Sequence, residues 1–172
     1  MEKQKIHPYR NFGDHILNDK YTFQVKHSSL PKMSILKKNF SPNGVCKIFN
    51  GSYVWGRDST RNDKNDVKSK DVVSVLKHFN YSISSYEAIQ WGLRYSLLPA
   101  DLNELYAFAM NEETSQLQFQ FPIVGLGSYT MYFGIYVPVL TSISAQRALQ
   151  GSRSHSGIHG WGIHHRFLYI SL

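Results

Sequence analysis

Apolar and polar residues alternate in several parts of this chain, and the alternation predicts β-strands. Residues 20–26 alternate in this way and predict a first strand. Two further strand-like runs, 45–49 and 53–55, flank the pair Asn50-Gly51. Because the central positions of a tight hairpin turn need positive φ, which Asn and Gly tolerate, this pair predicts a β-hairpin.

In the middle of the chain the apolar residues recur at helical spacing instead. A first helix is predicted after Ser69 or Asp71 by a set of four residues: Val72, Val75, Leu76 and Phe79. A second helix is predicted to open at Ser84, three residues before Glu87, in the pattern of a capping box. It should run to Leu98, with Leu93 in the core, and Pro99 should stop it. Residues 101–110 fit a third short helix or the approach to a strand.

After residue 116 the two-residue period returns. Strands are predicted over residues 117–121, over 129–140 with Pro138 at a strand end or edge, and over 166–170. A short helix is predicted to begin at Ser142 or Ser144 and to run through Leu149. Together these elements predict an α+β fold, a single compact domain of antiparallel strands with two or three central helices.

The charge of the chain is concentrated in its first part. Residues 1–70 hold fourteen lysines and arginines against six acids, a balance of +8. Residues 71–172 hold five against six, a balance of −1, which together give the net charge of +7. We therefore predict a basic, partly disordered N-terminal arm over residues 1–44 and a globular α+β domain over residues 45–172.

Basic arms bind phosphates, so the cations of the arm are the predicted contacts with an anionic membrane or a nucleocapsid. Most of them are lysines, which favours diffuse attraction over bidentate base recognition. The predicted binding residues are Lys3, Lys5, Arg10, Lys20, Lys26, Lys32, Lys37 and Lys38. A polar loop over residues 56–70 is a predicted secondary basic site, with Arg57, Arg61, Lys64, Lys68 and Lys70.

Candidate catalytic chemistry is sparse. The motifs of serine hydrolases, zinc proteases and P-loop enzymes do not occur in the sequence, and we predict no enzyme activity and no cofactor. Four of the eight histidines lie within eleven residues, and they are either structural or metal-binding: His155, His159, His164 and His165. Because carboxylates are missing between them, a metal would need histidine ligands alone, and we predict no metal site.

The N-terminus is polar and has no apolar run behind it, so we predict no secretory signal. No stretch approaches the roughly 18 apolar residues that span a bilayer. Cys46 is the only cysteine, which fits a reducing compartment such as the cytosol.

The order of these features resembles the matrix proteins of rhabdoviruses, above all the short, plant-infecting type. A basic arm and a strand pair precede the segments Lys70–Phe79 and Ile89–Leu98, and aromatic strands follow. Animal-virus relatives carry a Pro-Pro-x-Tyr budding signal, for which the nearest counterpart here is Pro8-Tyr9.

The resemblance implies a non-enzymatic viral structural protein that condenses the nucleocapsid, self-associates and links the coil to the envelope during assembly and budding. Its implied partners are the viral nucleoprotein–RNA complex, an anionic membrane surface, further copies of itself and an envelope glycoprotein tail. Its implied location is the virion, the host cytoplasm and the inner face of host membranes.

Two other hypotheses stay open on the residues alone. The basic arm also fits a nucleic-acid-binding protein, such as an RNA-binding silencing suppressor or a phage-encoded factor. The C-terminal histidines leave room for a small nuclease or toxin.

Overall fold

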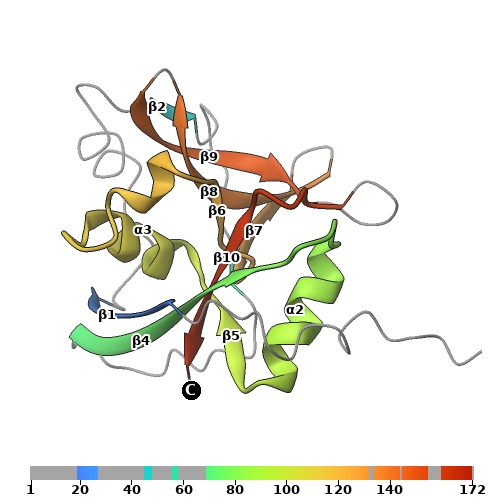
Figure 1. Ribbon diagram of the computed structural model, residues 1–172, viewed down its shortest axis with the longest axis horizontal. Coiled ribbons are helices and arrows are strands. Elements are labelled where there is room, and N and C mark those ends of the chain that lie inside the picture. Colours follow the sequence, from blue (N-terminus) through green and yellow to red (C-terminus); the bar gives the residue numbers. More distant parts are fainter. Residues whose placement is uncertain are drawn as a thin grey trace, which may run out of the picture.

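The computed structural model describes residues 19–26, 45–47, 56–57, 69–131, 134–143, 145–154 and 160–171. Within these residues the fold is α+β, with strands in a mixed sheet and two α-helices (Figure 1). In chain order the elements are β1 (Asp19–Lys26), β2 (Val45–Lys47), β3 (Gly56–Arg57), β4 (Ser69–His78), α2 (Ser85–Arg94), β5 (Leu97–Pro99), α3 (Leu102–Met110), the 3₁₀-helix η2 (Leu117–Phe119), β6 (Ile123–Val124), β7 (Ser128–Met131), β8 (Ile135–Ile143), β9 (Gln146–Arg153) and β10 (Arg166–Ser171).

The sheet follows the order β1-β4-β10-β6-β8-β7-β3, with β5 paired to β10, β9 to β8, and β2 to β9. Most neighbours are antiparallel, as expected from the sequence. Two pairs, β10 with β6 and β2 with β9, are parallel. The sheet is therefore mixed, which corrects the prediction of antiparallel strands alone.

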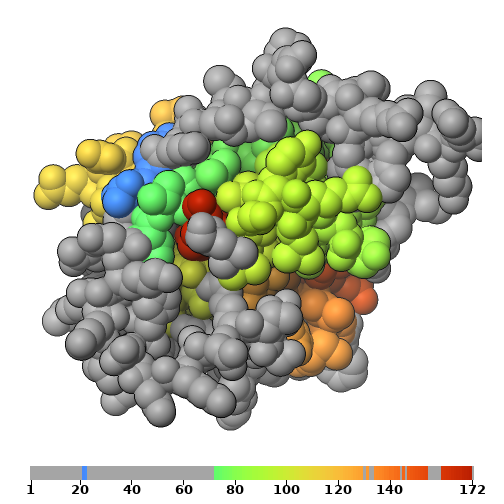
Figure 2. Space-filling model, turned by 90° about the horizontal axis from the view of Figure 1, so that it is seen from below, coloured from blue at the N-terminus to red at the C-terminus, as the bar shows by residue number. Residues whose placement is uncertain are grey.

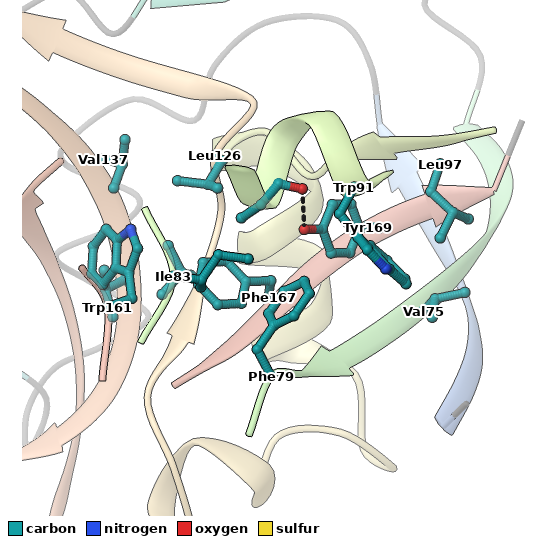
Figure 3. Packing of buried hydrophobic residues seen from close by; sticks show 13 residues of the cluster. Val75, Phe79, Ile83, Trp91, Leu97, Leu126, Val137, Trp161, Phe167 and Tyr169 are labelled. Carbon is teal, nitrogen blue, oxygen red and sulfur yellow. Dashed lines mark hydrogen bonds between the residues drawn. The ribbon is translucent and has the colours of Figure 1, made fainter. Parts of the chain in front are cut away.

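The central strands β4 and β10 are buried on both faces: α3 covers one face and α2 covers the other. Alternate residues of β4 and β10 pack on the side of α3, and the residues between them pack on the side of α2. We call these two sets the α3-side core, with Val72, Leu76, Leu168 and Ile170 from the two strands, and the α2-side core, with Val75, Phe79, Phe167 and Tyr169. Figure 3 shows the second set, in which the Tyr169 hydroxyl donates a hydrogen bond to the carbonyl oxygen of Ala88 in α2, 2.7 Å away.

The helix predicted after Ser69 is wrong, because this segment is β4. The four apolar residues divide between the two cores: Val72 and Leu76 face one side, and Val75 and Phe79, the residue after the strand, face the other. A strand covered on both faces can place apolar residues at positions that also match a helical period. β-Branched valines at three of its positions favour the extended form.

The capping box of α2 is confirmed. The Ser84 Oγ accepts the Glu87 N–H, and the Glu87 carboxylate accepts the Ser84 N–H at 2.9 Å. The helix ends at Arg94, four residues before the predicted end, and the chain then turns at Ser96, whose φ is 56°. Leu97–Pro99 pair with β10, so tertiary pairing ends the helix before Pro99 does.

Residues 102–110 form α3, the helical alternative for this segment, capped by Asp101 and Glu104. The strand predicted over residues 117–121 is wrong, because Leu117–Phe119 form a 3₁₀-helix. The amides of Phe119 and Gln120 bond to carbonyls three residues earlier, so local turns satisfy the backbone that a strand partner would otherwise satisfy.

The run predicted as one strand over residues 129–140 contains β7 and most of β8, which pair as a hairpin. Pro138 lies inside β8, which corrects its predicted place at a strand end or edge. β8 pairs with β7 through Tyr136 and with β6 through Val139. Pro138 therefore lies between the residues that pair with β7 and with β6. It also pairs with Gly151 of β9, and its carbonyl accepts the Gly125 N–H at 3.0 Å.

The helix predicted through Leu149 is also wrong. This segment is β9, which folds back on β8 with Ile143 opposite Gln146. The turn between them is only two residues long, and Ala145 in it has φ of 60°. Its sequence lacks the Asn-Gly signal of such turns, so the hairpin is not visible in the residues.

Replacing Ala145 with glycine should raise the free energy of unfolding by about 0.5–1 kcal/mol, because glycine adopts positive φ without the steric cost that a Cβ adds. Urea denaturation measures the change. The matched control is Ala148→Gly in the interior of β9, which should lower stability by a similar amount. A loss of stability from both variants would contradict the prediction.

The strands predicted over residues 20–26 and 166–170 are confirmed as β1 and β10. Of the hairpin predicted around Asn50-Gly51, only part of the first strand is described: it is β2, which pairs with β9. The turn and the second strand of that hairpin lie outside the described residues. Both ends of the polar loop predicted over residues 56–70 are strand, in β3 and β4.

Candidate interaction surface

Four of the predicted basic residues lie in described strands. Lys20 and Lys26 belong to β1, Arg57 to β3 and Lys70 to β4. In the β1–β4 ladder Lys26 pairs with Ser69, and the preceding residue of β1 pairs with Lys70. The register therefore brings Lys26 of the predicted arm and Lys70 of the predicted secondary site to the same end of this ladder, whereas Lys20 lies toward the other end.

The remaining basic residues of the two predicted sites lie outside the described residues, and their roles stay predictions: Lys3, Lys5, Arg10, Lys32, Lys37, Lys38, Arg61, Lys64 and Lys68. Part of the predicted arm does belong to the sheet, because β1 pairs with β4 along its full length. Tyr21 of β1 also packs edge-on against Phe108 of α3, with ring centroids 5.5 Å apart.

Hydrogen bonds join four elements at one end of the sheet. The Trp161 indole N–H and the Ser154 hydroxyl both donate to the Ser85 hydroxyl oxygen, each at 2.8 Å. The backbone N–H of Ser154 donates to the Ile135 carbonyl at 2.6 Å. Trp161 also exchanges two backbone hydrogen bonds with Ile83. The starts of α2 and β8, the end of β9 and the C-terminal turn therefore meet here.

Large apolar side chains on the segments that meet at this junction are open to solvent. Tyr86 is 69% exposed, Met131 63%, Ile163 58% and Ile135 46%. Tyr86 follows Ser85 in the chain, Met131 pairs with Ile135 in the β7–β8 hairpin, and Ile163 lies two residues after Trp161. We call these four residues the end surface. Figure 2 shows α2 and part of the β7–β8 region, in yellow-green and orange, on one outer face of the molecule. A contiguous exposed apolar surface is typical of a binding site, and these four side chains come from segments that meet at one junction.

The β7–β8 hairpin fits such a surface because it has no charged side chains and because of the conformation of its turn. Residues 114–146 contain no lysine, arginine, aspartate or glutamate. Gly134 in the turn has φ of 145°, and a Cβ there would lie 3.0 Å from the Arg153 Nε. Glycine is therefore needed at this position, and it lets a guanidinium lie against the apolar hairpin.

The C-terminal turn adds further basic groups. The His164 and His165 rings lie 4.2 Å apart between centroids, and His165 packs against Trp161 at 5.1 Å. The His78 Nε2–H donates to the Ile163 carbonyl at 2.7 Å. Burial lowers the pKa of His78, the hydrogen bond to Ile163 opposes that shift, and the nearby Arg166 and Lys77 lower the pKa further.

The Arg166 guanidinium holds the turn from the side of β10. It donates to the carbonyls of Ile163 and His165, each at 3.3 Å, and lies over the Phe121 ring at 4.7 Å. Together with His78 it fixes the backbone of the turn on both sides, while Ile163 and His164 remain exposed.

Lys77 is a buried lysine, which the sequence does not predict. It is fully buried on the α2 side of β4. Its Nζ lies 4.8 Å from the Trp91 ring centroid and 5.4 Å from that of Phe79. Burial lowers its pKa from 10.5 to about 8. Burial of this kind disfavours the charged form of a lysine.

Among the described residues no group of three or more His, Cys, Asp or Glu side chains is placed to hold a metal ion. Of the four clustered histidines, His164 and His165 are described, whereas His155 and His159 lie outside the described residues. The choice between structural and metal-binding histidines therefore stays open for the full set. No helix in the described part of the chain is long and apolar enough to cross a membrane.

The sequence predicts basic contact residues, whose role stays a prediction, and gives no indication of the end surface. The exposed fractions of Tyr86, Met131, Ile135 and Ile163 depend on which elements cover them, and no local pattern records this. The one available signal is the uncharged, aromatic run after residue 128, whose pattern predicts only a strand.

Comparison with protein-family models, with curated proteins and with solved structures finds no match to this chain.

Proposed function

We propose that this chain is a matrix-type structural protein of an enveloped virus, which condenses the nucleocapsid, self-associates and links it to the membrane. The observation that carries the proposal is the separation of charge along the chain, +8 over residues 1–70 and −1 over residues 71–172. A basic segment attracts nucleoprotein and anionic lipid over a long range. A nearly neutral body can then pack against copies of itself without strong repulsion.

The described residues support the same proposal in two ways. Lys26 and Lys70 lie at one end of the β1–β4 ladder, so the basic character of the N-terminal part extends onto the folded sheet. The end surface offers exposed apolar side chains next to an uncharged hairpin, which suits contact with a second apolar surface.

A second candidate is a nucleic-acid-binding protein. The lysine-rich segment supports it, because lysines neutralise phosphates without reading bases. Electron microscopy of the purified protein, alone and with liposomes, distinguishes the two candidates. The first predicts ordered arrays or lipid-bound coats. The second predicts monodisperse protein particles that shift only when RNA is added.

Replacing Lys32, Lys37 and Lys38 together with glutamine should weaken binding to anionic liposomes or nucleoprotein by about 10- to 100-fold at low salt. Each lysine near an anionic surface contributes roughly 1 kcal/mol, and the contribution shrinks as salt screens it. Co-sedimentation at low and high ionic strength measures the loss, and the salt dependence should flatten in the variant.

The matched control replaces Arg61, Lys64 and Lys68 with glutamine, which removes the same charge from the predicted secondary site. If the control weakens binding while the first variant binds like the parent, the contact lies in the secondary site and the predicted role of the arm is wrong. If the parent binds neither liposomes nor nucleoprotein, the matrix proposal itself fails.

A further inference from the structure

The turn over residues 160–166 combines an exposed apolar side chain with basic groups. Ile163 is 58% exposed, and His164 beside it is exposed as well. The backbone under them is held by His78 at 2.7 Å and by Arg166 at 3.3 Å, both of which donate to the Ile163 carbonyl. A turn that is fixed before binding loses little conformational freedom when a partner arrives.

The charged groups around the turn are nearly all basic. β4 contributes Lys77 and His78, β10 contributes Arg166, and the turn contributes His164 and His165. The one carboxylate of α2, Glu87, is engaged by the amide and hydroxyl of Ser84. Residues 114–171 contain no aspartate or glutamate. Among the described residues of these elements the acids are Glu87, which keeps its charge while it accepts hydrogen bonds, and Asp71 near the opposite end of β4 from His78. Basic groups therefore outnumber acidic ones beside the turn.

We propose that this turn is a membrane contact on the folded body, in which Ile163 enters the headgroup region of an anionic bilayer and the imidazoles of His164 and His165 meet the lipid phosphates, more tightly as the pH falls. The inference rests on the proposed membrane attachment and adds to it a second contact, separate from the basic arm, that responds to acid.

Anionic lipid is the occupant that fits this turn, for two reasons. The basic groups complement a negative surface, and imidazoles gain positive charge as the pH falls from 7.5 to 5.5. An apolar side chain at the tip adds a contact that salt does not screen and that a nucleic acid phosphate backbone does not reward. His78 has a lowered pKa and lies beside the Ile163 carbonyl, so it gains charge later than an ordinary histidine.

The test is co-sedimentation of the full chain with phosphatidylserine-containing and pure phosphatidylcholine vesicles at pH 7.5 and 5.5. We expect the parent to bind the anionic vesicles roughly tenfold more tightly at pH 5.5. The double variant His164→Gln/His165→Gln should lose most of that gain. Removing two arm imidazoles, with His7→Gln/His15→Gln, should leave most of it.

A second pair of variants separates the apolar contribution. Ile163→Ser should weaken binding to anionic vesicles by roughly tenfold at both pH values, since one aliphatic side chain no longer leaves water. Leu93→Ser, which changes an exposed leucine on α2, should leave binding within about twofold. Circular dichroism establishes that the variants are folded.

Any of four outcomes would overturn the inference. Parent binding that is equal at the two pH values, or a double variant that keeps the full gain, would exclude the histidine turn while leaving the proposed function in place. A pH-dependent gain for single-stranded RNA without one for vesicles would assign the turn to nucleic acid. A parent that binds anionic vesicles at neither pH would overturn both this inference and the membrane part of the proposed function.

Discussion

Replacing Phe79 with alanine is expected to lower the free energy of unfolding by about 3–5 kcal/mol, the usual cost of emptying an aromatic site in a packed core. The Phe79 side chain is fully buried in the α2-side core. Its ring meets Trp91 and Phe167 edge-on, with both pairs of centroids 5.4 Å apart (Figure 3). The cavity would therefore also remove two favourable aromatic contacts. Urea denaturation measures the loss.

Leu93→Ala is the matched control, because the sequence placed Leu93 in the core and the structure leaves it 49% exposed on α2. It should change stability by no more than about 0.5 kcal/mol. Leu76→Ala, on the opposite face of β4, should cost about 2–5 kcal/mol. If Leu93→Ala cost as much as Phe79→Ala, the packing of α2 described here would be wrong.

The elements that the sequence predicts correctly are those with a local signature. The capping box at Ser84 and Glu87 indicates the start of α2, because its two hydrogen bonds are made within four residues. β1 was predicted from its strict alternation of apolar and polar residues. Both signals can be found without knowledge of the rest of the chain.

β4 could not be predicted correctly in this way, because its environment is set by distant segments. β1 and β10 pair with it on its two edges, and α2 and α3 cover its two faces. A strand enclosed like this keeps apolar residues on both sides and loses the alternation that identifies a half-buried strand. The resulting spacing of Val72, Val75, Leu76 and Phe79 equals that of a helix.

The prediction for the residues of β9 is wrong for a different reason. Its turn with β8 requires positive φ, yet the described turn residue is Ala145, so the residues carry no turn signal. The serines nearby instead suggested a helix cap. The pairing of β9 with β8 along its full length outweighs that local preference.

Of the candidate surface, the sequence predicts only basic residues, whose binding role stays a prediction. Lysines stay at the surface almost wherever the chain goes, so the basic residues could be named from the sequence. The apolar residues of the end surface could not, because a leucine or isoleucine is usually buried and its exposure depends on what covers it. Lys77 is the converse case, a lysine that the fold buries between aromatic rings.

Lys77 also gives the second large prediction, which concerns pH. Burial lowers its pKa from 10.5 to about 8, so the folded state disfavours the charged form. At 1.36 kcal/mol for each pH unit, this difference corresponds to roughly 3 kcal/mol of lost stability below pH 8. Between pH 8 and 10.5 the folded state releases the proton that the unfolded state still holds, so this group makes stability rise with pH in that window.

Lys77→Met is therefore expected to stabilise the protein by up to about 3 kcal/mol at pH 7, and by much less at pH 10.5. Methionine has a similar length, and its sulfur packs well against aromatic rings such as Trp91. Urea denaturation of the parent and the variant at pH 7, 9 and 10.5 gives the difference in stability at each pH, from which the contribution of other titrating groups cancels.

Lys77→Arg is the control that keeps the charge. Because a guanidinium stays protonated throughout this range, the variant should lack the rise between pH 8 and 10.5 and should be no more stable than the parent at pH 7. A Lys77→Met variant that is less stable than the parent at pH 7 would show that the ammonium group makes a net favourable contribution there, through its position over Trp91 and Phe79, larger than the cost of its burial.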